Sequence, residues 1–151
     1  MRKASAPIGA LLVAGLALLP LGGCARSGAR IPDLRFPNAP VVLISVDTLR
    51  SDRLPMYGYG KVATPALDAL RKDAILFERA YSHIPLTLPS HTSLFTGLEP
   101  GMHGVLDNSG YRLPAGDPTL AELLKKAGYA TGGAVSAAVL GGRSGIGRGF
   151  D

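Results

Sequence analysis

A run of six residues, Val41 to Val46, limits the fold of this chain more than any other segment. It reads Val-Val-Leu-Ile-Ser-Val, so apolar and mostly β-branched side chains follow one another without a polar alternation. A strand that is buried on both faces has this composition, and such strands occur mainly in parallel sheets covered by helices. The run therefore predicts a strand of a parallel sheet.

Helix signals recur along the rest of the chain. Thr64-Pro65 is typical of a helix start, because Pro fits the first helical position. A short helix is predicted over residues 89–96, with Gly97 ending it. Asp117-Pro118 predicts the start of a further helix, which Gly128 closes.

Two further strands are predicted between these helices, over residues 75–81 and 129–136. Strands that alternate with helices indicate an α/β fold with a mainly parallel sheet sandwiched between helices. The chain has 151 residues, and 46% of them are hydrophobic, so one domain with a real core is possible.

The first 24 residues have the pattern of an export signal. Arg2 and Lys3 precede an apolar stretch, and the segment ends in Leu-Gly-Gly-Cys24, which resembles the bacterial lipobox. We predict a lipoprotein signal peptide over residues 1–24, lipidation of Cys24, and a lipid-anchored protein of the bacterial cell envelope. The alternative is an uncleaved membrane helix, although Pro7 and Pro20 leave a short apolar run.

Residues 25–40 contain Ser, Gly, Arg and three prolines, and they are predicted to be a tether before the domain at 41–151. The formal charge is +5, from 16 basic and 11 acidic residues. The basic residues are scattered without a run of five or more, so no nucleic-acid partner is predicted.

Asp47 follows the first predicted strand directly. Open α/β sheets bind ligands beyond the carboxyl ends of their strands, and a carboxylate at that place suits a metal ion. Asp47 could equally cap a turn. Thr87 precedes the predicted helix at 89–96, whose N-terminus suits a phosphate, a sulfate or an oxyanion. A metal held by Asp47 could activate the Thr87 hydroxyl as a nucleophile, but Thr87 could also be a plain N-cap.

The segment Thr87 to Gly97 reads Thr-Leu-Pro-Ser-His-Thr-Ser-Leu-Phe-Thr-Gly. It resembles the first sulfatase signature, in which a Cys or Ser precedes x-Pro-Ser-Arg and a Thr-Gly follows. Residues 42–50 resemble the first metal-ligand strand of that family. Three later segments resemble the family as well: 103–108, 128–129 and 148–151. From about residue 40 onward the chain is thus similar to the N-terminal part of sulfatases of the alkaline phosphatase superfamily. This resemblance implies their α/β fold, here incomplete, and a metal-dependent ester hydrolase.

Departures from the family pattern bear on the chemistry. Thr87 stands where Cys or Ser becomes formylglycine, and its methyl group would give a ketone. Thr48, His91 and Ser136 replace an Asp, an Arg and a Lys. These changes favour resemblance to the threonine-using relatives: nucleotide pyrophosphatase/phosphodiesterases, phosphopentomutases and lipoteichoic acid synthase-like transferases. Phosphate esters are therefore expected to be preferred over sulfate esters.

The resemblance also implies a set of site residues. Asp47 and Thr87 would bind a divalent metal ion (Ca, Zn or Mn), Thr87 and His91 would be catalytic, and Asn108 would contact a phosphoryl oxygen. Two of these residues have a plainer interpretation: His91 could lie on the helix surface, and Asn108 could belong to a turn. His103 is predicted to be structural.

Three functions stay open at this point. The first is an exported hydrolase of small-molecule, glycan or lipid esters, and the second is a transferase of phospho-groups between envelope molecules. The third is an inactive, truncated lipoprotein. In the family the remaining metal ligands come from much later in the chain, so we predict a fragment or a truncated product that lacks them.

Overall fold

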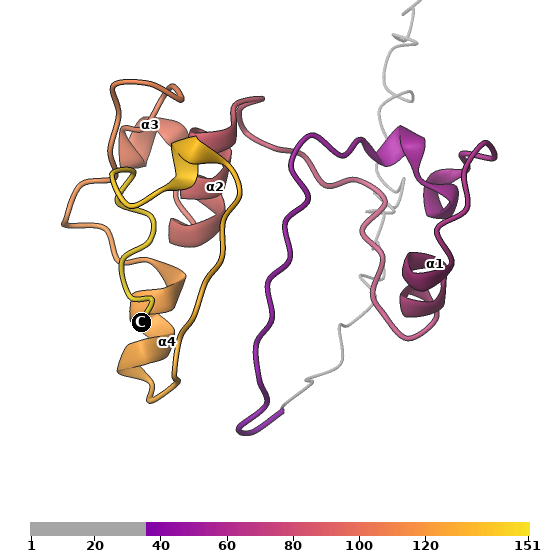
Figure 1. The fold of residues 1–151 in the computed structure, drawn as a ribbon, viewed down its shortest axis with the longest axis horizontal. Helices are drawn as coiled ribbons and strands as arrows, with labels where there is room; N and C mark the ends of the chain where they lie inside the picture. Colours follow the sequence, from indigo (N-terminus) through magenta and orange to yellow (C-terminus); the bar gives the residue numbers. More distant parts are fainter. Residues whose placement is uncertain (1–35) are drawn as a thin grey trace, which may run out of the picture. The chain divides into compact units, whose positions relative to one another are not determined.

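The computed structural model describes residues 36–151 (Figure 1). The predicted signal peptide, Cys24 and most of the predicted tether lie outside the described residues. The chain divides into two compact units, and the division falls between Leu43 and Ile44. In the first unit, a turn follows Phe36, whose carbonyl accepts a hydrogen bond from the Ala39 amide at 3.2 Å.

The second unit, residues 44–151, consists of short helices joined by irregular segments. None of its helices has both the length and the apolar character that crossing a membrane requires. In chain order the elements are the 3₁₀ helices η1 (Ser51–Arg53) and η2 (Pro55–Tyr57), the α-helices α1 (Pro65–Arg71), α2 (Thr87–Thr96), α3 (Pro100–His103) and α4 (Leu120–Lys126), and the 3₁₀ helix η3 (Ala138–Leu140).

The three predicted strands, at 41–46, 75–81 and 129–136, are wrong for the described part of the chain. Each of these segments is irregular, and no strand forms within residues 36–151. A strand is stable only when a neighbour pairs with its backbone N–H and C=O groups, and none does so here. The apolar side chains of the first two segments are consequently exposed, as Ile44 (80%) and Phe77 (66%) illustrate. The predicted sheet is therefore not confirmed.

The helix predictions agree better with the structure, because a helix forms its backbone hydrogen bonds within a single segment. Helix α1 begins at Pro65, as predicted, and the Thr64 hydroxyl donates to the Asp68 carboxylate at 3.3 Å. Helix α2 begins at Thr87, two residues before its predicted start. Gly97 ends it in the left-handed conformation, at φ 70°, which glycine adopts without strain.

Helix α4 begins later than Asp117-Pro118 predicted. Its N-cap is Thr119, whose hydroxyl accepts a hydrogen bond from the Glu122 amide at 3.2 Å. The Glu122 carboxylate in turn accepts from the Thr119 amide at 2.8 Å. This reciprocal capping box satisfies two amide groups and fixes the helix start. Gly128 follows the helix, as predicted, at φ 92°.

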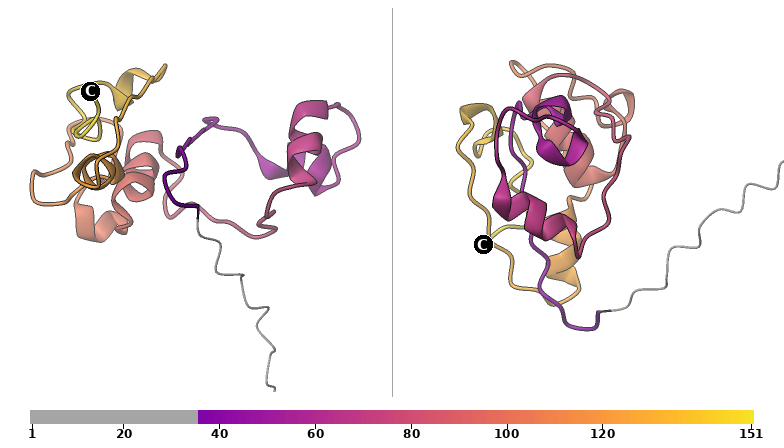
Figure 2. Two further views of the ribbon diagram at one scale, coloured as in Figure 1. Left: turned by 90° about the horizontal axis from the view of Figure 1, so that it is seen from below. Right: turned by 90° about the vertical axis from the view of Figure 1, so that its right-hand side faces the viewer.

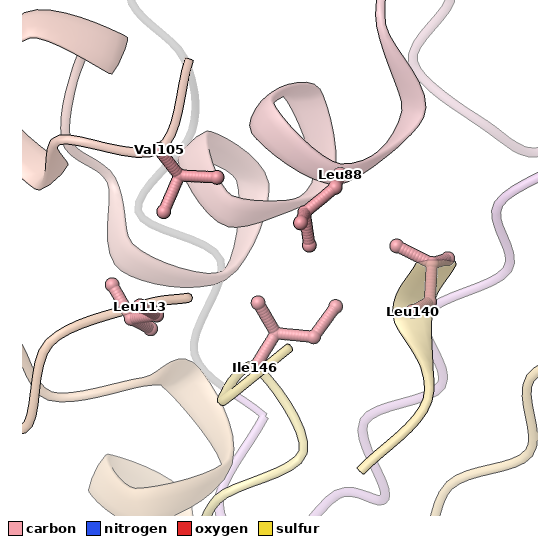
Figure 3. Close-up of a cluster of buried hydrophobic side chains, with 5 residues drawn as sticks. All are labelled: Leu88, Val105, Leu113, Leu140 and Ile146. Carbon is pink, nitrogen blue, oxygen red and sulfur yellow. The ribbon is translucent and has the colours of Figure 1, made fainter. Parts of the chain in front are cut away.

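Helix α2 lies at the centre of the packed part of this unit. It contacts α3, α4 and η3. Figure 1 shows these elements grouped around α2, and Figure 2 shows the same part of the chain from two further sides. Beneath α2, buried apolar side chains from five positions gather around Ile146 (Figure 3). They are Leu88, Val105, Leu113, Leu140 and Ile146. Leu88 belongs to this core, so the core fixes the position of its neighbour Thr87.

The last four residues hold the packed part together. The Arg148 guanidinium donates to the carbonyls of Pro114, at 2.7 Å, and Asp117. The Arg148 carbonyl accepts from the buried Thr119 hydroxyl at 2.7 Å. Phe150 packs edge-on against Phe95 of α2, with ring centroids 5.9 Å apart. The segment at 148–151, which resembles the family pattern, is therefore a packing element.

Candidate active site

Two residues predicted to act together, Asp47 and Thr87, lie in contact. The Thr87 hydroxyl donates a hydrogen bond to Asp47 Oδ2 at 3.2 Å, across 40 residues of sequence. Thr87 is the first residue of α2 and is half-buried, whereas Asp47 is exposed. The alternative that Thr87 is the N-cap is wrong, because Leu86 holds that position. The Thr87 hydroxyl is thus directed to a carboxylate.

The backbone turns sharply directly after Asp47. Thr48 has φ 59°, a left-handed conformation that is unusual for a β-branched residue and costs about 1–2 kcal/mol. The Leu49 amide closes the turn by donating to the Val46 carbonyl at 3.4 Å. Strained backbone of this kind occurs where surrounding contacts hold a functional side chain in place. Here it follows the carboxylate that meets Thr87.

His91 forms a second link between the same two segments. Its Nε2 lies 2.9 Å from the Ser45 hydroxyl. Ser45 and Asp47 are two residues apart, while Thr87 and His91 are four apart on α2. Alternate residues of an extended segment share a face, and so do residues four apart on a helix. The two hydrogen bonds therefore link the same two segments, and His91 is a half-buried residue of the helix surface with a partner in residues 44–47.

The hydrogen-bond partners also fix where His91 carries its proton. Its Nδ1 lies 2.8 Å from the Thr87 carbonyl, which can only accept, so Nδ1 is protonated. In the neutral ring Nε2 then accepts from the Ser45 hydroxyl. His91 meets the backbone of Thr87 rather than its hydroxyl, which suits a positioning role.

Asn108 reaches the first turn of α2. Its Oδ1 accepts a hydrogen bond from the Leu88 amide at 2.8 Å, which fixes the orientation of the side-chain amide. The Asn108 NH₂ group donates no hydrogen bond within residues 36–151. Asn108 also sits in the predicted turn, where the Ser109 amide donates to Asp107 Oδ1 at 3.3 Å. The turn and the proximity to Thr87 are thus compatible.

The start of α2 offers fewer amide donors to an anion than the sequence suggests. The Leu88 amide is already bonded to Asn108, and Pro89 has no N–H group. The Ser90 amide donates to the Leu86 carbonyl at 3.1 Å. Asn108 NH₂ therefore replaces the Leu88 amide as a donor that a bound anion can use.

Metal-binding side chains are sparse in the described residues. No group of three or more His, Cys, Asp or Glu that could hold a metal ion occurs within residues 36–151. Asp47 and Thr87 do supply a carboxylate and a hydroxyl oxygen at one place, and oxygen donors suit hard divalent cations. These two groups would supply part of the coordination sphere of such a cation.

His103 has the predicted structural role. It is buried, and its Nδ1 accepts from the Val105 amide at 3.1 Å. Its Nε2 lies 3.0 Å from the Ser93 hydroxyl. Burial lowers the pKa of His103 below its ordinary value of 6.5, although the charge of Asp117 opposes this shift. Because Nδ1 accepts from the Val105 amide, this nitrogen carries no proton in the folded arrangement.

Two features near Thr87 escaped the sequence analysis. One is Ser45, the partner of His91, which the two-residue spacing before Asp47 could have indicated. The other is a cavity of about 470 Å³ next to α2. Leu88 and Asn108 line it together with residues 109–111, two residues of η3 and the loop at 141–144 that follows it.

Comparison with known proteins finds sulfatases. The sulfatase family model matches residues 39–150. An N-acetylgalactosamine-6-O-sulfatase of Bacteroides thetaiotaomicron is 33% identical over 125 residues, which are 80% of this chain and 24% of that protein. An ulvan-active sulfatase of Formosa agariphila is 40% identical over 96 residues, or 63% of this chain and 19% of that protein.

Human arylsulfatase A is 40% identical over 103 residues, which are 65% of this chain and 20% of that protein. The chain therefore spans about a quarter or less of the length of these relatives. No solved structure matches the chain.

Proposed function

The chain belongs to the sulfatase family, and on this premise we propose that it acts in ester hydrolysis through the Thr87 hydroxyl, with phosphate esters favoured. The observation that carries the proposal is the hydrogen bond from Thr87 to Asp47 at the start of α2. A hydroxyl is a weak nucleophile unless a neighbouring group removes its proton. Asp47 is the group in contact with that proton.

The reaction has two steps. The Thr87 oxygen attacks the phosphorus atom as its proton passes to Asp47, and the bond from phosphorus to the alcohol oxygen breaks. The alcohol leaves with a proton taken from solvent, and a phosphothreonine remains while Asp47 holds the Thr87 proton. Water then attacks the phosphorus and loses a proton to solvent, the bond to the Thr87 oxygen breaks as that oxygen recovers its proton from Asp47, and phosphate is released. The Asn108 NH₂ group would donate to the charge that develops on the phosphoryl oxygens.

His91 and Ser45 would position the reacting pair. Because Ser45 Oγ lies 2.9 Å from His91 Nε2, the segment that carries Asp47 is tied to α2 at a second point. His91 also donates to the Thr87 carbonyl and thereby orients the first turn of the helix. Holding two reacting groups in a fixed geometry lowers the entropic part of the barrier.

Sulfatase-family enzymes generally use a divalent metal ion. Asp47 and Thr87 would hold such an ion in part, and when bound it would lower the proton affinity of the Thr87 hydroxyl. The preference for phosphate is our inference from Thr87 itself, which cannot become formylglycine. The relatives are sulfatases by name, so the choice between sulfate and phosphate needs a direct measurement.

The test uses the intact protein with Thr87→Ala, Thr87→Ser and Asp47→Asn. We expect Thr87→Ala to lower kcat by about a thousandfold or more and Thr87→Ser to keep part of the activity. The Thr87→Ala, Asp47→Asn double variant should be little worse than either single variant, since residues that act as a unit are not additive. A thermal melt checks that each variant is folded. Near-normal kcat in Thr87→Ala would refute the nucleophile.

The ester preference is measured separately on the same protein. We expect a higher kcat/KM on an aryl phosphate than on the matching aryl sulfate. The opposite order would refute the phosphate preference and leave the role of Thr87 to the variants above.

A further inference from the structure

We propose that the cavity beside α2 binds a second anionic group on the substrate, and that Arg143 determines this specificity. This inference rests on the proposed function, because the first anionic group is the ester that meets Thr87. The substrate class is then an ester whose alcohol portion carries an acidic substituent. Arg143 would bind that substituent, not the reacting atoms.

The position of the cavity makes it an extension of the site. Leu88, one of its lining residues, directly follows Thr87 in the chain. Asn108 is another lining residue. Its Oδ1 accepts a hydrogen bond from the Leu88 amide, and its NH₂ group has no hydrogen-bond partner within the described residues. Thr87 itself does not line the cavity, but Asn108 does, so a molecule whose phosphoryl oxygen meets the Asn108 NH₂ group can place its alcohol portion in this cavity. Its volume of about 470 Å³ lies within the range of ligand pockets.

The charge of the lining selects an anion. Arg143 is the one charged residue among those of 36–151 that line the cavity. The other lining residues are uncharged, and Ser109 and Tyr111 are the exposed hydroxyl-bearing residues among them. An unpaired cation beside neutral hydroxyl groups favours a ligand with negative charge.

Arg143 also differs from the structural cations nearby. Lys125 forms an ion pair with Asp151, and Arg148 lies 3.6 Å from Glu122. In contrast, no carboxylate of residues 36–151 lies within ion-pair distance of Arg143. Its guanidinium is exposed and stabilises no other charge in this part of the chain. A ligand carboxylate, sulfate or phosphate would supply the missing partner.

The loop that carries Arg143 is held from both sides. The Ser144 amide donates to the Gly141 carbonyl at 2.9 Å, and the Ser144 carbonyl accepts from the Leu113 amide at 2.9 Å. Ser144 is buried, so the turn is anchored in the packed part of the unit. The wall that precedes Arg143 consists of Gly141 and Gly142, which leave the cavity open. A fixed turn places the cation with little loss of backbone freedom on binding.

The test measures binding of two probes by calorimetry, benzylphosphonate and 3-carboxybenzylphosphonate, to the intact protein. The probes differ only in the carboxylate. We expect the carboxylated probe to bind about tenfold more tightly, and Arg143→Ala to reduce this ratio to about twofold or less. Arg143→Gln, which keeps the length and polarity of the side chain, should lose the preference as well. Arg112→Ala is the matched control, because Arg112 is an exposed cation in the same region that does not line the cavity.

The outcomes separate the two proposals. Equal or undetectable binding of both probes by the unmodified protein would overturn the role of Arg143. Retention of the preference in Arg143→Ala, or its loss in Arg112→Ala, would overturn it too. Thr87→Ala should keep the tenfold ratio while losing turnover. If Thr87→Ala retains turnover, the proposed nucleophile fails, whereas the binding ratio still decides the role of Arg143.

Discussion

Residues 44–81 are more apolar in sequence than residues 87–151, yet only the second region buries its apolar side chains. In the second region Leu88 and Leu113 are each 2% exposed, whereas Val46 and Ile75 in the first region are both 62% exposed. The difference lies in the kind of element that each region forms. Helices satisfy their own backbone, so short helices can gather around Ile146. Strand-like runs need partner strands before they can bury anything.

The C-terminal residues add a second difference between the regions. Arg148 to Asp151 return to the start of α4 and to Thr131, so contacts distant in sequence close the second region. The first region contains no buried side chain, and its contacts, such as the one between η2 and α1 and the bond from the Tyr57 hydroxyl to the Phe77 carbonyl at 3.0 Å, enclose no core. We therefore expect substitutions of equal size to have large effects in the second region and small effects in the first.

The largest effect should come from Gly149→Ala. Gly149 has φ 90°, and a methyl group there would lie 2.3 Å from the Glu122 amide nitrogen. The three nearest atoms are all backbone atoms of Ala121 and Glu122 in α4, which cannot move aside as a side chain could. We therefore expect a loss of about 4 kcal/mol or more in the free energy of unfolding. Gly147→Ala is the control, since nothing lies within 4 Å of that position. Denaturant unfolding of the 151-residue chain measures both, and equal stability of the two variants would show that the closure at α4 is not tight.

The next effect compares Leu113→Ala with Ile44→Ala. Truncation of buried Leu113 removes apolar contacts and leaves a cavity, which costs about 3 kcal/mol. Ile44 is 80% exposed, so the same truncation there should change the free energy of unfolding by about 0.5 kcal/mol or less. Denaturant unfolding again gives the values. If Ile44→Ala costs as much as Leu113→Ala, residues 44–46 are buried in the chain, and the difference between the two regions disappears.

The sequence alone predicts the ends of the helices better than it predicts the strands. Local signals were read correctly: Pro65 begins α1, Gly97 ends α2, and Gly128 follows α4. These signals depend on φ angles and on the missing N–H of proline, which each residue carries by itself. The strand predictions depended on partners that a single segment cannot show. The family fold is α/β, yet residues 36–151 form no strand.

The site was predicted in part. Placing Asp47 at a strand end and Thr87 at a helix start indicated that they could meet, and their side chains are in contact. The hydrogen bond from the Ser45 hydroxyl to His91 was missed, although both spacings are visible in the sequence. The cavity beside Asn108 could not be foreseen, because its wall comes from η3 and the loop at 141–144, whose return to α2 depends on tertiary packing.

A smaller effect tests the two N-cap threonines, one in each region. Thr119 is buried and takes part in a capping box, and its hydroxyl also donates to the Arg148 carbonyl. Thr119→Ala should therefore cost about 2 kcal/mol. Thr64 caps α1 without a hydrogen bond to the helix amides, so Thr64→Ala should cost a few tenths of a kcal/mol. Thermal melts of both variants check the order. A larger loss in Thr64→Ala would show that α1 is packed more firmly than its exposed side chains indicate.

The smallest effect is a pH dependence that belongs to the second region. Burial holds the pKa of His103 below 6.5 in the folded chain, while the exposed ring of the unfolded chain titrates near 6.5. As the pH falls below about 6.5, the unfolded state takes up a proton that the folded state does not, so stability falls with it. This contribution is fully present above the unfolded pKa and is lost as the pH falls toward the folded one. Protonation of Nδ1 would also break the bond from the Val105 amide.

His103→Asn keeps an acceptor near that position and removes the titration. The measurement is the free energy of unfolding from pH 8 to pH 5, and the unmodified chain should lose more stability than His103→Asn over that range. Identical pH profiles would mean that His103 is solvated in the folded chain, and that the packed region around α2 is looser than its side-chain burial indicates.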